Sequence, residues 1–148
     1  TGAVPEQNTQ VSVSRFGELM IGLDTQGTPV MIESTGATEV GSLSGVIEVD
    51  SGVEHVCARL ADGSVKCWGA NNYGQLGNNS TVESTKPVSV TGLPGAIDLG
   101  VGRNHACVIV TATLLDTLIE CWGQNLDGQL GNGTTVNSST PVEVLTDN

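Results

Sequence analysis

Four cysteines and two histidines carry the most reactive side chains of this 148-residue sequence. They form two sets in the same order: His55, Cys57 and Cys67, then His105, Cys107 and Cys121. Two cysteines opposite each other on neighbouring strands have nearly the separation that a disulfide needs. A histidine with two cysteines is instead one ligand short of a closed zinc site, and the close C-x-x-C spacing is missing. We therefore predict two disulfides, Cys57–Cys67 and Cys107–Cys121, and no metal; a zinc site stays open as the competing interpretation.

A β-hairpin is the element that places the first pair of cysteines together. Apolar residues alternate from Val56 to Leu60 and from Val65 to Trp68. Between them, Ala61 to Gly63 form a three-residue connection with glycine where a positive φ is needed. Counting back from this turn sets Cys57 opposite Cys67. Paired cysteines imply an oxidising compartment, so we expect an extracellular, secreted or surface-exposed chain.

The hairpin belongs to a tandem repeat that starts at Ile47 and again at Ile97. Residues recur at an offset of fifty and, after the insertion from Thr113 to Asp116, at an offset of fifty-four. The insertion lengthens the second turn and leaves Cys107 opposite Cys121. The motif residues that we assign a structural role are His55, Trp68, Gly69, Gly74, Gln75 and Gly77 in the first copy and His105, Trp122, Gly123, Gly128, Gln129 and Gly131 in the second.

The pattern H-x-C-A, D-G-S-V and W-G-x-N-x-x-G-Q-L-G closely resembles the RCC1 family of β-propeller repeats, strongly over residues 47–148 and weakly over 11–46. The resemblance implies an all-β fold of antiparallel four-stranded blades that present binding loops. It also implies that Trp68 and Trp122 pack between blades rather than stack on sugars. We expect His55 and His105 to be hydrogen-bonded blade positions.

Three segments follow: residues 1–46, a degenerate blade or an attachment element, and the repeats 47–96 and 97–148. Laying residues 11–33 over 47–69 puts Gly27 under Gly63 and puts Ile21 and Met31 at the two cysteine positions. A propeller closes with four to eight blades, so this one is an incomplete ring unless other chains complete it. Unpaired edges and apolar faces then invite further repeats of a longer chain or other copies of this one.

Two prolines mark the last strand that we predict in each copy. Pro87 to Val90 and Pro141 to Val144 have the composition of short strands. We place each proline at the first residue of its strand, where the missing N–H is tolerated.

Catalysis finds little support in the sequence. Neither histidine has a nearby nucleophile that is free, and the carboxylates form no constellation. The glycines of G-Q-L-G are not a phosphate loop, because no Lys-Ser or Lys-Thr follows them. We predict no enzymatic activity and no cofactor.

The charge balance excludes some partners. Five Lys and Arg against sixteen Asp and Glu give a net charge of −11, which disfavours nucleic acid. No apolar stretch is long enough to insert into a membrane. The chain begins at Thr1 rather than Met, so we expect that it was processed or cut from something longer.

The polar loops Asn71–Ser84 and Asn125–Ser139 are the surfaces that we expect to bind a protein or glycan partner. The favoured hypothesis is a non-catalytic extracellular binding and assembly module. One alternative is an oligomeric bacteriophage decoration or fibre protein, because VSVSRFGELMIG loosely resembles the β-forming openings of some virion proteins. A second is a fragment of a guanine-nucleotide exchange factor, an activity known in the family, which the predicted disulfides, the acidity and the missing blades disfavour.

Overall fold

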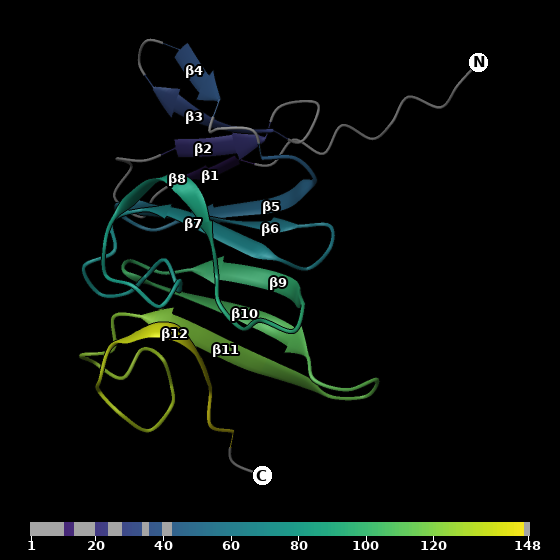
Figure 1. The fold of residues 1–148 in the computed structure, drawn as a ribbon, viewed down its shortest axis with the longest axis vertical. Coiled ribbons are helices and arrows are strands. Elements are labelled where there is room, and N and C mark those ends of the chain that lie inside the picture. The colour runs from purple at the N-terminus through teal and green to yellow at the C-terminus, as the bar shows by residue number, and fades with distance from the viewer. Residues whose placement is uncertain (1–10, 14–19, 24–27, 34–35, 40–42, 147–148) are drawn as a thin grey trace.

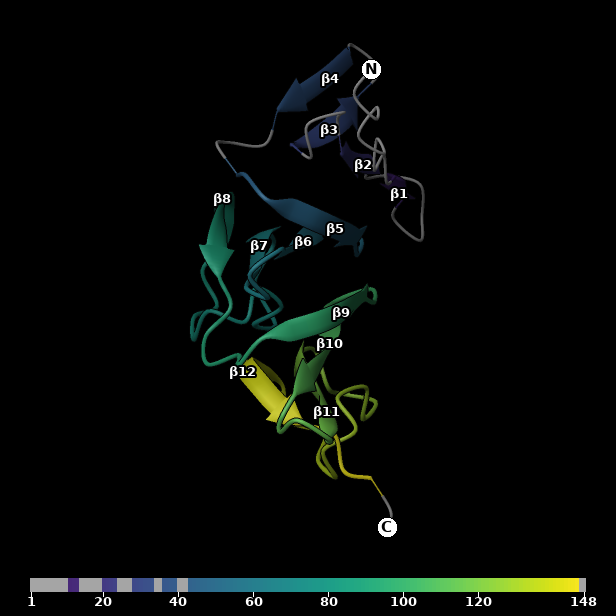
Figure 2. The same cartoon turned by 90° about the vertical axis from the view of Figure 1, so that its right-hand side faces the viewer.

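The computed structural model describes residues 11–13, 20–23, 28–33, 36–39 and 43–146. Within these residues the fold is all-β, with three antiparallel four-stranded sheets, each in simple up-and-down order. The sheets follow one another along the long axis, and each faces the next (Figures 1 and 2). The predicted fold class is confirmed, and the ring is not closed. No helix in this part of the chain is long and apolar enough to cross a membrane.

The three sheets are named here by their place in the chain. The front sheet consists of β1 Val11–Val13, β2 Met20–Leu23, β3 Pro29–Glu33 and β4 Gly36–Glu39. The middle sheet consists of β5 Val46–Ser51, β6 His55–Leu60, β7 Val65–Gly69 and β8 Ser84–Ser89. The last sheet consists of β9 Ala96–Val101, β10 His105–Thr111, β11 Thr117–Gly123 and β12 Ser138–Glu143.

The predicted hairpin register is confirmed in both repeats. Cys57 is the partner of Cys67 across β6 and β7, and the turn residue Gly63 has a φ of +85°. Cys107 is the partner of Cys121 across β10 and β11. A short connection leaves a hairpin little choice of register, which is why counting from the turn succeeded.

The front sheet has the same strand order as the two repeats. Ile21 is the partner of Met31 across β2 and β3, the same relation that Cys57 has to Cys67. Gly27 lies outside the described residues. The division at residues 46 and 96, and the choice between a degenerate blade and an attachment element, stay predictions.

The position predicted for the two prolines is wrong. β8 begins at Ser84 and β12 at Ser138, so Pro87 and Pro141 lie inside their strands. Both strands are at the edge of their sheets, and the pairing register shifts before each proline. An edge strand with an irregular register tolerates a residue that cannot donate a hydrogen bond.

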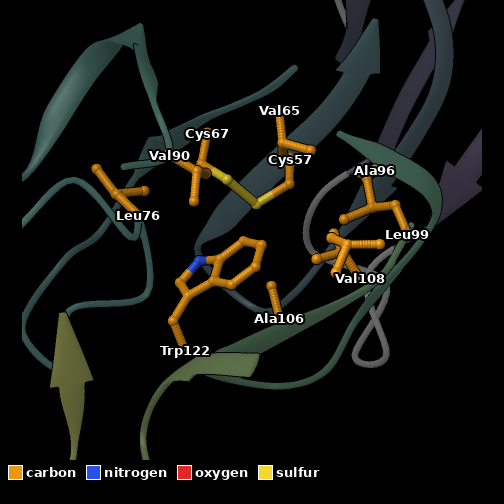
Figure 3. Close-up of a cluster of buried hydrophobic side chains, with 11 residues drawn as sticks. Cys57, Val65, Cys67, Leu76, Val90, Ala96, Leu99, Ala106, Val108 and Trp122 are labelled. Carbon is orange, nitrogen blue, oxygen red and sulfur yellow. A yellow bond between two sulfur atoms is a disulfide. The ribbon is translucent and has the colours of Figure 1, made fainter. Parts of the chain in front are cut away.

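Two buried clusters hold the sheets together. One joins the middle and last sheets around Trp122, and Leu99, Ala106 and Val108 pack in it against the Cys57–Cys67 pair (Figure 3). The other joins the front and middle sheets around Trp68. Burying these apolar faces between sheets is the main stabilising contribution to the stack.

Candidate binding surface

Both predicted disulfides are present in the structure. They join Cys57 to Cys67 and Cys107 to Cys121, and the described residues include no free cysteine. Because the two sulfurs of each pair are bonded to each other, neither pair can supply the thiolate ligands of the competing zinc interpretation.

The disulfides differ in their surroundings. The Cys57–Cys67 pair is buried, and the indole of Trp122 lies beside it (Figure 3). In the second pair, Cys121 is buried but Cys107 is only half-buried. The same motif therefore lies in an interface between sheets in one copy and near the surface in the other.

His55 is fully buried at the start of β6, against the backbone of Gly52 and near the carbonyl oxygen of Gly102. The expectation that it is hydrogen-bonded through its ring is wrong: neither ring nitrogen has a partner in the described part of the chain. Burial, reinforced by nearby His105 and opposed by Asp50, lowers the pKa of His55 to about 4. The imidazole is therefore neutral at pH 7 and works as a packing group.

His105 has the equivalent position in the last sheet but is half-buried. Partial burial lowers the pKa of His105 as well. The ring borders a polar cavity of about 470 Å³. Its other lining residues are Tyr73, Gly102, Arg103, Asn104, Gln124, Asp127 and Gln129.

The two tryptophans pack between sheets, as the family resemblance implies. The indole N–H of Trp122 donates a hydrogen bond of 2.9 Å to the main-chain carbonyl of Gln75 in the middle sheet's G-Q-L-G turn. Trp68 is buried against the front sheet, but no partner for its indole N–H exists in the described residues.

The G-Q-L-G turns are closed by their own glutamines. The side-chain oxygen of Gln75 accepts a bond from the N–H of Tyr73, and that of Gln129 accepts one from Asp127. Gly77 has a φ of +66°, and a Cβ there would approach the Trp122 indole nitrogen to 2.8 Å. A side chain at this position would push the last sheet away from the middle one.

Two buried asparagines that sequence reasoning did not assign a role fix the loops behind these turns. The Asn71 amide nitrogen donates to Asn78 and to the carbonyls of Ser80 and Val82, and its oxygen accepts the N–H of Leu76. Asn125 makes the corresponding bonds in the last repeat, to residues 130, 132, 134 and 136. Recurrence of both asparagines in W-G-x-N was the signal that could have revealed this role.

The two polar loops named from the sequence thus have one shared conformation and project alike from successive sheets. At the same point of each loop an apolar side chain is exposed: Val82 at 70% and Val136 at 71%. A cavity of about 330 Å³ opens at the base of the first loop. Its lining residues are Glu54, Gly69, Ala70, Asn72, Glu83, Ser84 and Thr85.

Comparison with known families supports the geometry. A model described as "Regulator of chromosome condensation (RCC1) repeat" matches residues 62–109 and 121–148, and a second model with the same description matches residues 46–75. The chain belongs to the RCC1 repeat family. The resemblance inferred from the sequence is confirmed.

Among curated relatives, the human probable E3 ubiquitin-protein ligase HERC4 is 35% identical over 101 residues, which cover 67% of this chain and 9% of that protein. Among solved structures, human WBSCR16 matches 99% of this chain and 42% of its own, with a TM-score of 0.73 at 18% identity. Prp20p from Saccharomyces cerevisiae matches 97% and 40%, with a TM-score of 0.73 at 17% identity. This chain spans less than half of each of these relatives, and the structural matches establish the fold alone.

Proposed function

We propose that this chain is a non-catalytic protein-binding module that works outside the cell and contacts its partner through the loops Asn71–Ser84 and Asn125–Ser139. The observation that carries the proposal is the pair of buried asparagines, Asn71 and Asn125, which hold both loops in one conformation. A loop held in one conformation loses little entropy on binding.

The family supports binding rather than chemistry. The structure of Prp20p is described together with its binding properties to Gsp1p and histones, so an RCC1 fold can serve as a platform for protein partners. The partner proposed here differs in charge from a nucleic-acid-associated protein, because the chain carries −11. Partners with basic or apolar contact surfaces fit the exposed valines and the two carboxylates beside the first loop.

The disulfides support the extracellular setting. Two bonded pairs in a chain of this size are typical of secreted and surface-exposed proteins. Protein isolated from its natural source and alkylated without reductant should carry no label on the four cysteines. Four labelled thiols would contradict the setting without affecting the binding proposal.

Affinity capture with loop variants tests the binding surface. The double variant Val82→Asp, Val136→Asp changes two exposed side chains and should leave the fold intact, while proteins captured from the secreted and surface fraction of the source organism are lost. Leu115→Asp, at the exposed turn between β10 and β11, is the matched control and should retain them. Equal capture by all three proteins would overturn the assignment of the loops, and binding only on a glycan array would replace the protein partner with a carbohydrate.

A further inference from the structure

The outer face of the last sheet is a copy of a face that is buried in the middle sheet. We define this outer face by Cys107, Ile109, Ile119, Gly128, Gln129 and Val144. Val65 is 2% exposed between the middle and last sheets, whereas its repeat counterpart Ile119 is 42% exposed. Cys57 and Cys107 differ in the same direction. A cavity of about 260 Å³ opens on this face beside Cys107, Ile109 and Ile119.

The middle sheet shows what such a face accepts. The last sheet covers it with small residues and Trp122, whose indole N–H bonds to the Gln75 carbonyl. The approach is close: a Cβ on Gly74 would lie 2.6 Å from the Cα of Ser139.

The corresponding groups of the outer face are unused. Within the described residues, no hydrogen bond reaches the main-chain carbonyl of Gln129, the counterpart of Gln75. Gly128, the counterpart of Gly74, has a φ of +74° and nothing within 4 Å of a Cβ. The face therefore keeps both the acceptor and the space that the neighbouring sheet uses one repeat earlier.

A complementary face exists on the same chain. We define the Trp68 face by Val46, Val49, Val56, Ala58 and Trp68, the repeat counterparts of the last-sheet residues that cover the middle sheet. Trp68 is 4% exposed, and its indole N–H has no partner in the described part of the chain. The described residues that pack on this face from the front of the chain are Leu23 and Leu43.

We propose that the outer face is a docking surface for a second copy of this chain, whose Trp68 face takes the place that the last sheet has on the middle sheet. The Trp68 indole N–H of the second copy then donates to the Gln129 carbonyl, as Trp122 donates to Gln75. This exchanges the cover supplied by Leu23 and Leu43 for a full sheet face and satisfies a buried donor that is otherwise unpaired. The contact joins two different faces, so it propagates from copy to copy into a ring or a filament.

Charge sets the conditions under which this association is measured. Each copy carries −11, so two copies repel at low ionic strength. The apolar contact does not weaken with salt, and the dissociation constant should therefore fall as salt rises from low to physiological concentration and above.

Gly128→Asn tests the outer face with the full, oxidised chain. Asparagine tolerates a positive φ, and the single chain has room for it. In the assembly, the new side chain meets Thr85 of the second copy, the counterpart of Ser139. We expect the dissociation constant from sedimentation equilibrium to rise at least about tenfold, at an unchanged unfolding temperature.

Gly92→Asn is the matched control. Gly92 has a φ of +78° and nothing within 4 Å of a Cβ, but it lies in the turn after β8, away from the outer face. This variant should associate like the wild type. Wild-type chain that stays single at every concentration, or equal effects of the two variants, would overturn the proposal.

Trp68→Phe tests which face of the second copy docks. Loss of one hydrogen bond is worth about 1 kcal/mol, so we expect about fivefold weaker association. Trp122→Phe, which breaks a bond inside the chain, should lower the unfolding temperature more than Trp68→Phe does. Association unaffected by Trp68→Phe would overturn the pairing of Trp68 with Gln129.

Discussion

At the scale of single residues, position in the repeat does not determine environment. His55 and His105 occupy the same motif position, yet one is fully buried and the other borders a cavity. Cys57 and Cys107 differ in the same way. The difference arises because each sheet is covered by the next, and the described chain supplies no sheet beyond the last one.

The two disulfides should therefore differ in their rate of reduction. Reduction needs access to sulfur, and the sheet interface around Trp122 shields the Cys57–Cys67 pair. At a concentration where the chain is single, we expect Cys107–Cys121 to be reduced at least about tenfold faster. Timed alkylation followed by mass spectrometry of the peptides measures both rates, and equal rates would contradict the burial difference.

His55 should make the stability of the fold depend on pH. Its pKa is about 4 in the folded chain, while an unfolded histidine has a pKa of about 6.5. The stability is complete above pH 6.5 and is lost as pH falls toward 4, because the unfolded chain binds the proton that the folded chain excludes. The difference amounts to about 2–3 kcal/mol near pH 4.5.

Urea unfolding of the wild type and of His55→Gln between pH 7 and pH 4.5 checks this dependence. His105, whose lowered pKa acts in the same direction, and Glu120, whose pKa is raised by burial and by Glu143, remain in both proteins. The variant should lose about 2 kcal/mol less over this range. Parallel pH profiles would show that His55 titrates normally in the folded chain.

At the scale of elements, local signals predicted what local geometry determines. The turn at Gly63 fixed the pairing of Cys57 with Cys67, and the longer turn kept Cys107 opposite Cys121. The start of β8 at Ser84 was not predictable from Pro87, because edge pairing with Gly69 extends the strand backwards.

Contacts between sheets were predictable only where both repeats carry the same residue. Burial of both tryptophans followed from the repeated Trp-Gly pair. By contrast, an Asp50 carboxylate oxygen accepts the N–H of Val101 across the interface at 2.8 Å, and the counterpart of Asp50 is Gly100. No repeated pattern marks this contact.

The loop asparagines should behave as structural anchors. Asn71→Ala removes the partner of four hydrogen bonds under the first loop, and we expect a loss of about 2–4 kcal/mol in the free energy of unfolding. Asn72→Ala, an exposed neighbour of the same type, should change it by less than about 0.5 kcal/mol. Similar unfolding curves for the two variants in urea would refute the anchoring role.

At the scale of the whole molecule, the fold is an open stack with an acidic surface. Closure would bury the outer face of the last sheet, and the described chain does not achieve closure by itself. The apolar residues of that face, Ile109 and Ile119, are compatible with water only in part. Binding by the loops and docking on the outer face use different surfaces, so the two can operate together.

The molecular mass in solution tests this view most directly. Light scattering on the oxidised full chain in physiological salt, over a wide range of concentrations, should give an average mass that rises above the 15.1 kDa of one copy. The rise should disappear with Gly128→Asn and persist with Gly92→Asn. A mass of one copy at every concentration would contradict the claim that the open stack is completed by a second chain of its own kind.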